Sequence, residues 1–178
     1  MNDKELLSLY REEGKGHYAF NLVVEKYGER LYWHIRRMVT THEDADDLLQ
    51  NTFIKVWNSL PQFREESSLY TWLYRIATNE AITFVKRAKM RSFLSLSDYY
   101  KEVENHLESD IYFSGSEIQK KLHKAIQRLP KKQRAVFVMR YFDEMKYEDI
   151  SEILDTSVGA LKASYHHAYS KIQAWLTE

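Results

Sequence analysis

Residues that form tight turns are scarce in this sequence. Only five glycines and two prolines occur among the 178 residues. Sandwiches and barrels of short β-strands need many tight turns, which glycine and proline largely supply. Hydrophobic residues make up 44% of the chain, which is enough for a packed core. We therefore expect an all-α protein.

The spacing of apolar residues supports this expectation. In residues 17–39, apolar side chains recur three and four positions apart, the pattern of a helix with one buried face. They are Phe20, Val23, Val24, Tyr27, Leu31 and Ile35. The same reasoning predicts further helices over residues 41–60, 69–89, 116–129, 131–142, 147–154 and 158–176.

A change of composition divides the chain. Residues 91–116 contain two basic and five acidic side chains, are rich in serine, and end in Ser114-Gly115-Ser116. We interpret this stretch as a flexible acidic linker between two small helical domains, residues 1–90 and 117–178. One more amphipathic helix around residues 99–107 is the alternative.

Several classes of protein are excluded by what the sequence lacks. Without cysteine there can be no disulfide, thiolate metal site or cysteine nucleophile. The longest uninterrupted apolar run, residues 135–139, is too short to cross a membrane, and the start of the chain carries no targeting pattern. We expect a soluble, cytoplasmic protein with no membrane insertion.

The first informative motif is the helix predicted at residues 41–60. One of its faces sets Trp57 and Ile54 among polar residues, which is typical of an interface anchor. This docking face comprises Asp47, Gln50, Asn51, Ile54 and Trp57. The acidic residues that open the helix are also explained by its macrodipole. His42, Asp44 and Asp47 could ligate a hard metal, but no second cluster lies in register, so we predict no metal site.

The second motif joins a loop, residues 63–68, to the helix predicted at residues 69–89. The outer face of this helix carries aromatic, amide and basic side chains. Bases stack on aromatic rings, amides pair with base edges and cations hold phosphates, so this combination suits single-stranded nucleic acid. The candidate residues are Phe63, Arg64, Ser67, Tyr70, Tyr74, Arg75, Asn79 and Lys86. The alternative is a solvated face whose basic C-terminal end complements the helix macrodipole.

The third motif is a pair of predicted helices, residues 147–154 and 158–176, joined by a polar turn. This pattern is typical of a helix-turn-helix whose second helix enters the major groove of duplex DNA. With the apolar stripe packed inward, the residues available to DNA are Ser157, Gly159, Ala160, Lys162, Ala163, His166, His167 and Lys171. An ordinary helical hairpin is the alternative.

The strings DADDLLQNTF, TWLYRIATN and YEDISEIL followed by SVGALK are specific together. On these motifs, residues 19–89 resemble domain 2 of the extracytoplasmic-function sigma factors of bacterial RNA polymerase, and residues 129–173 resemble their domain 4. The resemblance implies that the first motif docks on the β′ clamp helices of core RNA polymerase. It implies that the second motif captures the melted −10 element of promoter DNA and that the third recognises the −35 element.

The same resemblance implies further partners. It suggests contact with the polymerase β subunit, a linker that runs toward the RNA exit path, and an anti-sigma factor that can hold the chain inactive. It implies neither an enzymatic activity nor a cofactor. The 26 basic and 26 acidic residues leave no net charge, which suits a protein that relies on the polymerase for affinity to DNA.

The helix-turn-helix departs from the family pattern at one place. Family members usually present several arginines along the second helix, where this chain has Ser164, His167, Tyr169 and Ser170. Each lost phosphate contact weakens DNA binding and its salt dependence. We therefore expect the strength of −35 recognition to be reduced.

Two other functions are consistent with parts of the sequence. A stand-alone helix-turn-helix regulator would bind operator DNA as a dimer, but it would need neither the Trp57 docking face nor the single-strand surface. A metalloenzyme built on the acidic cluster is the second alternative. Copurification with core RNA polymerase separates a sigma factor from both.

Overall fold

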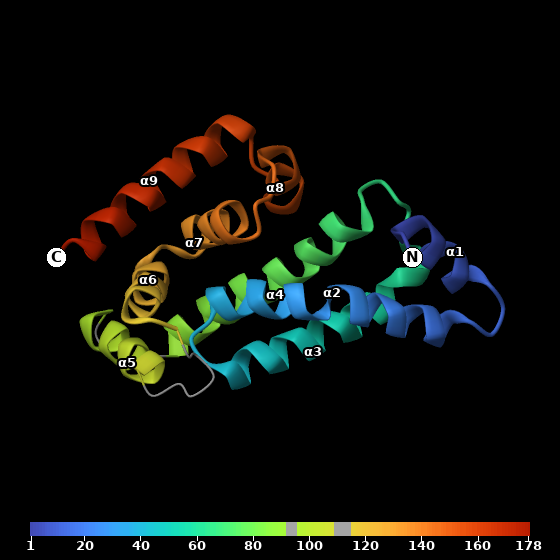
Figure 1. Ribbon diagram of the computed structural model, residues 1–178, viewed down its shortest axis with the longest axis horizontal. Helices are drawn as coiled ribbons and strands as arrows, with labels where there is room; N and C mark the ends of the chain where they lie inside the picture. The colour runs from blue at the N-terminus through green and yellow to red at the C-terminus, as the bar shows by residue number, and fades with distance from the viewer. Residues whose placement is uncertain (92–95, 109–114) are drawn as a thin grey trace.

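The computed structural model describes residues 1–91, 96–108 and 115–178 (Figure 1). Every regular element in these residues is helical, so the expected all-α class is confirmed. The elements are α1 (Asp3–Arg11), α2 (Gly16–Met38), α3 (His42–Ser59), the 3₁₀ turn η1 (Leu60–Gln62), α4 (Leu69–Arg91), α5 (Leu96–Glu108), α6 (Glu117–Arg128), α7 (Lys131–Phe137), its π-helical continuation η2 (Val138–Phe142), α8 (Tyr147–Leu154) and α9 (Val158–Leu176).

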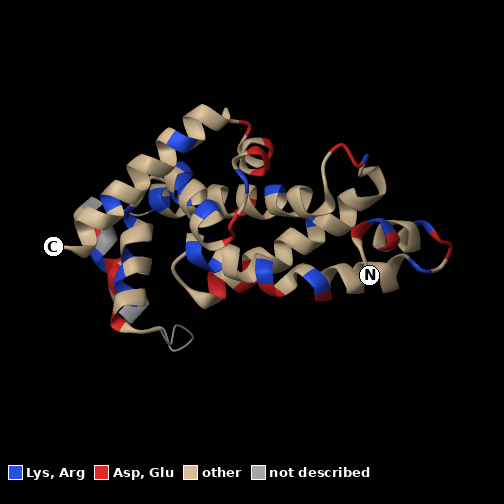
Figure 2. Cartoon of the chain, turned by 45° about the horizontal axis from the view of Figure 1, so that its top comes forward, with Lys and Arg blue, Asp and Glu red and all other residues tan. Residues whose placement is uncertain are grey.

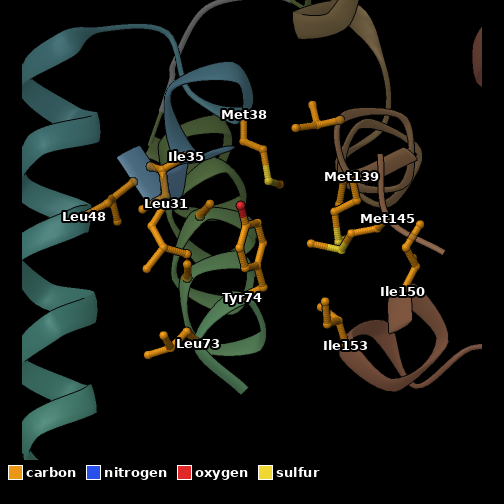
Figure 3. Close-up of a cluster of buried hydrophobic side chains, with 14 of the residues drawn as sticks. Leu31, Ile35, Met38, Leu48, Leu73, Tyr74, Met139, Met145, Ile150 and Ile153 are labelled. Carbon is orange, nitrogen blue, oxygen red and sulfur yellow. The ribbon is translucent and has the colours of Figure 1, made fainter. Parts of the chain in front are cut away.

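The N-terminal unit is a bundle of α2, α3 and α4, with α1 packed on α2. Its core contains Leu31 and Ile35 of α2, Leu48 of α3 and Leu73 of α4, all buried (Figure 3). Polar side chains fix the starts of two of these helices. The Thr41 hydroxyl accepts a hydrogen bond from the backbone N–H of Asp44 at 3.1 Å, a standard N-cap that satisfies one free donor of α3. The Ser68 hydroxyl does the same for α4.

The C-terminal unit contains α6 to α9 and ends in a helix-turn-helix. Ser116 and Gln119 form a reciprocal capping box at the start of α6. Asp155 adopts a left-handed backbone, with φ of 49°, and so ends α8. The Ser157 hydroxyl then accepts from the N–H of Ala160 at 3.2 Å and starts α9. The turn between the helices is therefore fixed by its own hydrogen bonds.

The stretch interpreted as a linker contains a helix, α5, as the alternative interpretation expected. Val103 is buried, and α5 packs on α6. The exposed Lys101 and Glu102 lie next to it in the sequence. A short amphipathic helix is stabilised when its apolar face packs against another element. The high serine content of the surrounding sequence did not indicate that such packing occurs. Tyr112, Phe113 and the rest of residues 109–114 lie outside the described residues.

The two units pack against each other along α4 and α2. Helices α7 and α8 contact α4, while α6 and η2 contact α2. Tyr74 and Met38 of the N-terminal unit point toward Met139, Met145, Ile150 and Ile153 of the C-terminal unit (Figure 3). The buried residues form one continuous apolar cluster across both units. We call this contact the interdomain joint.

Candidate nucleic-acid and partner interfaces

The docking face predicted on α3 borders an apolar groove. The groove has a volume of about 550 Å³ and lies between α2 and α3. It is lined by Phe20, Val24, Gly28, Leu49, Gln50, Phe53, Ile54 and Trp57. Ile54 is 58% exposed although it is apolar. An exposed apolar side chain on a concave apolar surface favours contact with another protein.

Trp57 is held in place by other helices. The His17 ring stacks on it with centroids 4.5 Å apart, and Phe20 meets it edge-on at 5.1 Å. A side chain that is already ordered loses little entropy on binding, which suits an interface anchor. The sequence analysis missed the role of both rings, because the groove exists only once α2 lies beside α3.

The other predicted docking residues divide into two groups. Gln50 lines the groove, and its side-chain amide donates to the Asp46 carboxylate at 3.0 Å. Asp47 and Asn51 are exposed on α3 but are not part of the groove lining. The structure therefore brings Gln50, Ile54 and Trp57 together and places Asp47 and Asn51 beside them.

The loop of residues 63–68 is attached to the N-terminal bundle. Phe63 packs on Trp72 of α4 with ring centroids 4.6 Å apart. Glu65 adopts a left-handed backbone, with φ of 59°, and forms an ion pair with Arg11 of α1. Arg64 is exposed, and Ser67 is half-buried. The loop therefore has a defined form that presents Arg64 to solvent ahead of α4.

Two tyrosines of the predicted single-strand surface lie at the interdomain joint. Tyr70 and Tyr74 are 4.6 Å apart between ring centroids, and the guanidinium of Arg30 lies 5.1 Å from the Tyr70 ring. Tyr74 is only 1% exposed, whereas Tyr70 is half-buried. Burial raises the pKa of both hydroxyls. In this arrangement Tyr74 offers no open ring face to a base.

Arg75 and Asn79 line a cleft between α4 and the C-terminal unit. The cleft measures about 590 Å³ and also includes Lys132, Glu152 and Asp155. The Arg75 guanidinium donates to the backbone carbonyl of Glu152 at 2.6 Å. Asn79 is exposed. The basic and amide groups predicted to bind DNA are thus adjacent, but a helix of this same chain lies opposite them.

The remaining candidates of this surface lie apart from the cleft. Phe63 and Arg64 precede α4, and the exposed Lys86 stands seven residues after Asn79, about 10 Å further along the helix. Arg30 of α2, which stacks on Tyr70, was not predicted. Its only signal in the sequence is its place in a basic and aromatic stretch of α2.

The second helix of the helix-turn-helix exposes its predicted contacts. All eight candidates are exposed: Ser157, Gly159, Ala160, Lys162, Ala163, His166, His167 and Lys171. Leu161, Ala168 and Ile172 are buried and hold the helix on its unit. A methyl group at Gly159 would meet nothing within 4 Å, so the packing of this chain does not require glycine there. The face is open to a partner as large as a DNA groove.

An aromatic cluster beside this helix was not predicted. Phe137 stacks on Tyr141 at 5.1 Å and on Tyr165 at 5.8 Å, and Tyr169 follows one turn later. Tyr141 and Tyr169 are each 48% exposed. Tyr141 lies four residues after Phe137, and Tyr169 lies four residues after Tyr165. This spacing could have indicated the cluster from the sequence, since residues four apart share a helix face.

Two features are absent from the part of the chain that the structure describes. No group of three or more side chains that could hold a metal ion occurs there. No helix there is both long enough and apolar enough to cross a membrane.

Comparison with known proteins identifies the family of this chain. The family model for sigma-70 region 2 matches residues 23–91, and the model for sigma-70 region 4 matches residues 119–172. An ECF RNA polymerase sigma-E factor of Haemophilus influenzae is 31% identical over 163 residues, covering 87% of this chain and 86% of its own. The chain belongs to the extracytoplasmic-function sigma factors of the sigma-70 family. Sigma factors of this family act in promoter-directed initiation of transcription.

Other relatives agree with this membership. The RNA polymerase sigma-H factor of Pseudomonas aeruginosa is 33% identical over 162 residues, covering 86% of this chain and 84% of its own. Among solved structures, CnrH in complex with the cytosolic domain of CnrY superposes with a TM-score of 0.70 at 22% identity, covering 98% of this chain and 97% of that one. The sigma factor RpoE of Bartonella quintana, solved with the anti-sigma factor NepR, gives 0.66 at 24% identity, covering 89% and 96%. Both structures share the fold of this sigma factor.

Proposed function

We propose that this sigma factor directs core RNA polymerase to its promoters through three separate surfaces. The groove between α2 and α3 docks on the β′ clamp helices. The loop of residues 63–68 and the outer face of α4 capture the melted −10 element. The exposed face of α9 recognises the −35 element, and the β subunit contacts the C-terminal unit. We assign the unit boundaries as residues 1–90 and 117–178, with residues 91–116 between them.

The observation that carries this proposal is the groove beside α3. A helix-turn-helix regulator that binds operator DNA alone needs one DNA surface and one dimer contact. Here a concave apolar surface with an exposed Ile54 and an anchored Trp57 occurs on a different unit from the helix-turn-helix. A protein partner for this surface explains why a chain with no net charge can act on DNA.

Holoenzyme assembly and run-off transcription with core polymerase test the proposal. Trp57→Ala should weaken assembly more than fivefold, since an interface anchor contributes more than about 1 kcal/mol. Ile54→Asp should act in the same direction, and because Ile54 is exposed, this change spares the fold. Tyr18→Ala is the matched control, because Tyr18 is an aromatic residue of α2 with 60% exposure and is outside the groove lining.

Start sites mapped from the run-off products identify the promoters. Normal assembly of both Trp57→Ala and Ile54→Asp, with wild-type melting temperatures, would contradict the docking assignment. Equal loss in Tyr18→Ala would do so as well.

We further propose an anti-sigma factor as a regulatory partner. Two structural relatives were solved with partners, one with the anti-sigma factor NepR and one with the cytosolic domain of CnrY. The groove and the exposed face of α9 are free to receive such a protein in the described part of the chain. A purified anti-sigma candidate should compete with core polymerase for this sigma factor, and simultaneous binding of both would contradict exclusion.

A further inference from the structure

Helix α1 contacts the loop that precedes α4. The guanidinium of Arg11, the last residue of α1, lies 2.5 Å from the Glu65 carboxylate. The two residues are 54 positions apart in the sequence, so this ion pair forms only in the folded chain. Acidic and basic residues both occur in this loop and in α1 (Figure 2). The contact therefore joins the N-terminal helix to the segment, residues 63–68, that we assign to the −10 element.

Helix α1 has a fixed position on the N-terminal bundle. It packs on α2, and the Tyr27 hydroxyl of α2 donates to the Asp3 carboxylate at 2.7 Å. At the other end of α1 the Tyr10 ring meets the Trp57 ring edge-on, with centroids 6.3 Å apart. Arg11 directly follows Tyr10. The end of α1 that carries Arg11 is therefore a fixed point to which the loop can be attached.

Glu65 has an uncommon backbone conformation. Its φ is 59°, in the left-handed region that residues with a Cβ adopt rarely. Such a conformation persists only where the surrounding structure holds it. The packing of Phe63 on Trp72 and the cap that Ser68 gives to α4 fix the two ends of the loop. The ion pair with Arg11 fixes its middle.

The charge of Glu65 is unfavourable in a loop that receives DNA. A carboxylate near the phosphates of a nucleic acid is repelled by them. The ion pair directs this carboxylate toward α1 and offsets its charge with a guanidinium. Arg64, the preceding residue, is exposed and suited to hold a phosphate. Arg11 can therefore influence DNA capture without touching DNA.

The ion pair is too exposed to contribute much to the fold. Its side chains are 58% and 39% exposed, whereas the interdomain joint contains a buried pair in which the His34 Nδ1 lies 2.8 Å from the Asp143 Oδ2. Exposed ion pairs add little to stability, because water and salt screen them. Loss of the Arg11–Glu65 pair should therefore change the form of the loop and leave the melting temperature nearly unchanged.

We propose that Arg11 is a positioning residue for −10 capture and acts through Glu65. It holds the loop of residues 63–68 in the form that presents Arg64 to DNA, and it keeps the Glu65 carboxylate away from the phosphates. The inference rests on the assignment of this loop to the −10 element. It goes beyond that assignment, because α1 belongs to none of the three proposed surfaces.

The test uses the assembled holoenzyme and a fluorescent single-stranded oligonucleotide that carries the non-template sequence of the mapped −10 element. Arg11→Glu places two carboxylates opposite each other and should weaken binding about three- to fivefold, the change that loss of an exposed ion pair produces. Low salt is used, because it screens such pairs least. Lys4→Ala is the matched control, since it removes another exposed cation of α1 and should leave the affinity unchanged.

A charge exchange separates positioning from a direct effect of charge on DNA. Glu65→Arg places two guanidiniums opposite each other, and adding Arg11→Glu restores an ion pair with the charges exchanged. Positioning predicts that Arg11→Glu tightens binding in the Glu65→Arg background, although it makes the protein more acidic. A direct electrostatic effect predicts that Arg11→Glu weakens binding in both backgrounds. Should Arg11→Glu melt below the wild type, Arg11→Gln replaces it, because it also relieves the repulsion in the Glu65→Arg background.

Each outcome decides the proposal. Weaker binding of Arg11→Glu in the wild-type background, together with tighter binding when it is added to Glu65→Arg, supports positioning. Weaker binding in both backgrounds overturns it. If Arg11→Glu changes nothing while Arg64→Ala weakens binding, the positioning role fails and the −10 assignment of the loop stands. If Arg64→Ala changes nothing as well, that assignment fails and the inference with it.

Discussion

The two surfaces proposed to bind DNA differ in how far the chain itself covers them. On α9 all eight predicted contact residues are exposed, whereas on α4 Tyr74 is almost fully buried and Arg75 is bonded to the C-terminal unit. Recognition of duplex DNA by α9 therefore needs no rearrangement of this chain. Capture of a single strand by Tyr74 and Arg75, as proposed, requires the chain to rearrange. The two proposed DNA surfaces therefore differ in accessibility, because the C-terminal unit packs on α4 and leaves α9 exposed.

The chemistry of the two faces explains the contrast. The eight predicted contacts on α9 are small, polar or basic side chains, which gain little from burial. The covered face of α4 contains Tyr74 and Thr78, whose rings, methyl groups and hydroxyls can be packed and hydrogen-bonded at the same time. Such a mixed face packs well against protein, and aromatic rings of this kind are also groups on which bases can stack.

The largest expected effect tests whether the joint is packed like a core. Ile153 is 4% exposed and lines the cleft opposite Arg75. Ile153→Ala should lower the free energy of unfolding by about 2–5 kcal/mol, through lost burial and the cavity that remains. Urea denaturation measures the loss, with the exposed Glu148→Ala on the same helix as control. A loss below about 0.5 kcal/mol would show a loose contact, and the contrast between α4 and α9 would then disappear.

The pH dependence of stability tests the part of the interdomain joint between α6 and α2. His123 of α6 is buried, and burial, with Arg36, Arg134 and Arg37 adding to it, lowers the pKa of His123 from 6.5 to about 3. Its Nε2 lies 3.5 Å from the Arg36 guanidinium of α2. Below pH 6.5 the unfolded chain binds a proton that the folded chain does not. The stability that neutral His123 provides is therefore complete above pH 6.5 and is lost as the pH falls toward 3.

The expected loss is roughly 3 kcal/mol at pH 4.5, because each pH unit below 6.5 costs about 1.4 kcal/mol. The measurement is the free energy of unfolding from pH 7 to pH 4.5 for the wild type and for His123→Gln, which cannot bind this proton. Their difference should shrink or reverse on acidification by roughly that amount. Parallel curves would show that His123 is accessible to water and that α6 is not closed on α2.

Local structure was largely predictable from the sequence. The helix predicted at residues 69–89 is Leu69–Arg91 in the structure, and the helices predicted at residues 147–154 and 158–176 have the same bounds as α8 and α9. Long amphipathic periods and caps such as Thr41 fix these elements locally. Helix α1 was not predicted, because nine residues carry too few apolar positions to establish a period.

The joint could not be predicted, for a different reason. His34 and Asp143 are 109 residues apart, and no local pattern links them. Thr78 and Tyr74 stand where a solvated or DNA-binding face was expected, since periodicity identifies faces but does not say which of two faces a second unit will cover. The groove is similar: Gln50, Ile54 and Trp57 were predicted from α3 alone, whereas His17 and Phe20 required the placement of α2.

A smaller effect would sharpen the assignment of the covered surface. Asn79 is exposed at the edge of the joint and follows Arg75 by one helical turn. Asn79→Ala should relax the preference for one −10 base by about 1–3 kcal/mol if the amide makes a bidentate contact. It should also impair transcription from a duplex promoter more than from a template already mismatched open at the −10 element. Unchanged base preference across all four bases at each non-template position would make this part of α4 a solvated face.

The smallest expected effect concerns the open surface on α9. Lys162 is exposed, with its Nζ 5.8 Å from the Tyr147 ring, so it is positioned without being buried. The affinity for −35 duplex DNA falls as the salt concentration rises. If Lys162 neutralises one phosphate, Lys162→Ala should make the slope of log affinity against log salt less steep by about 1, because one fewer counterion is released. Capture of pre-melted −10 DNA should not change.

Lys101→Ala, which removes an exposed cation of α5, is the control for net charge. If the α9 variant lost both activities together, the two DNA surfaces would not be independent. Covering of α4 and exposure of α9 would then have no separate consequences for promoter binding.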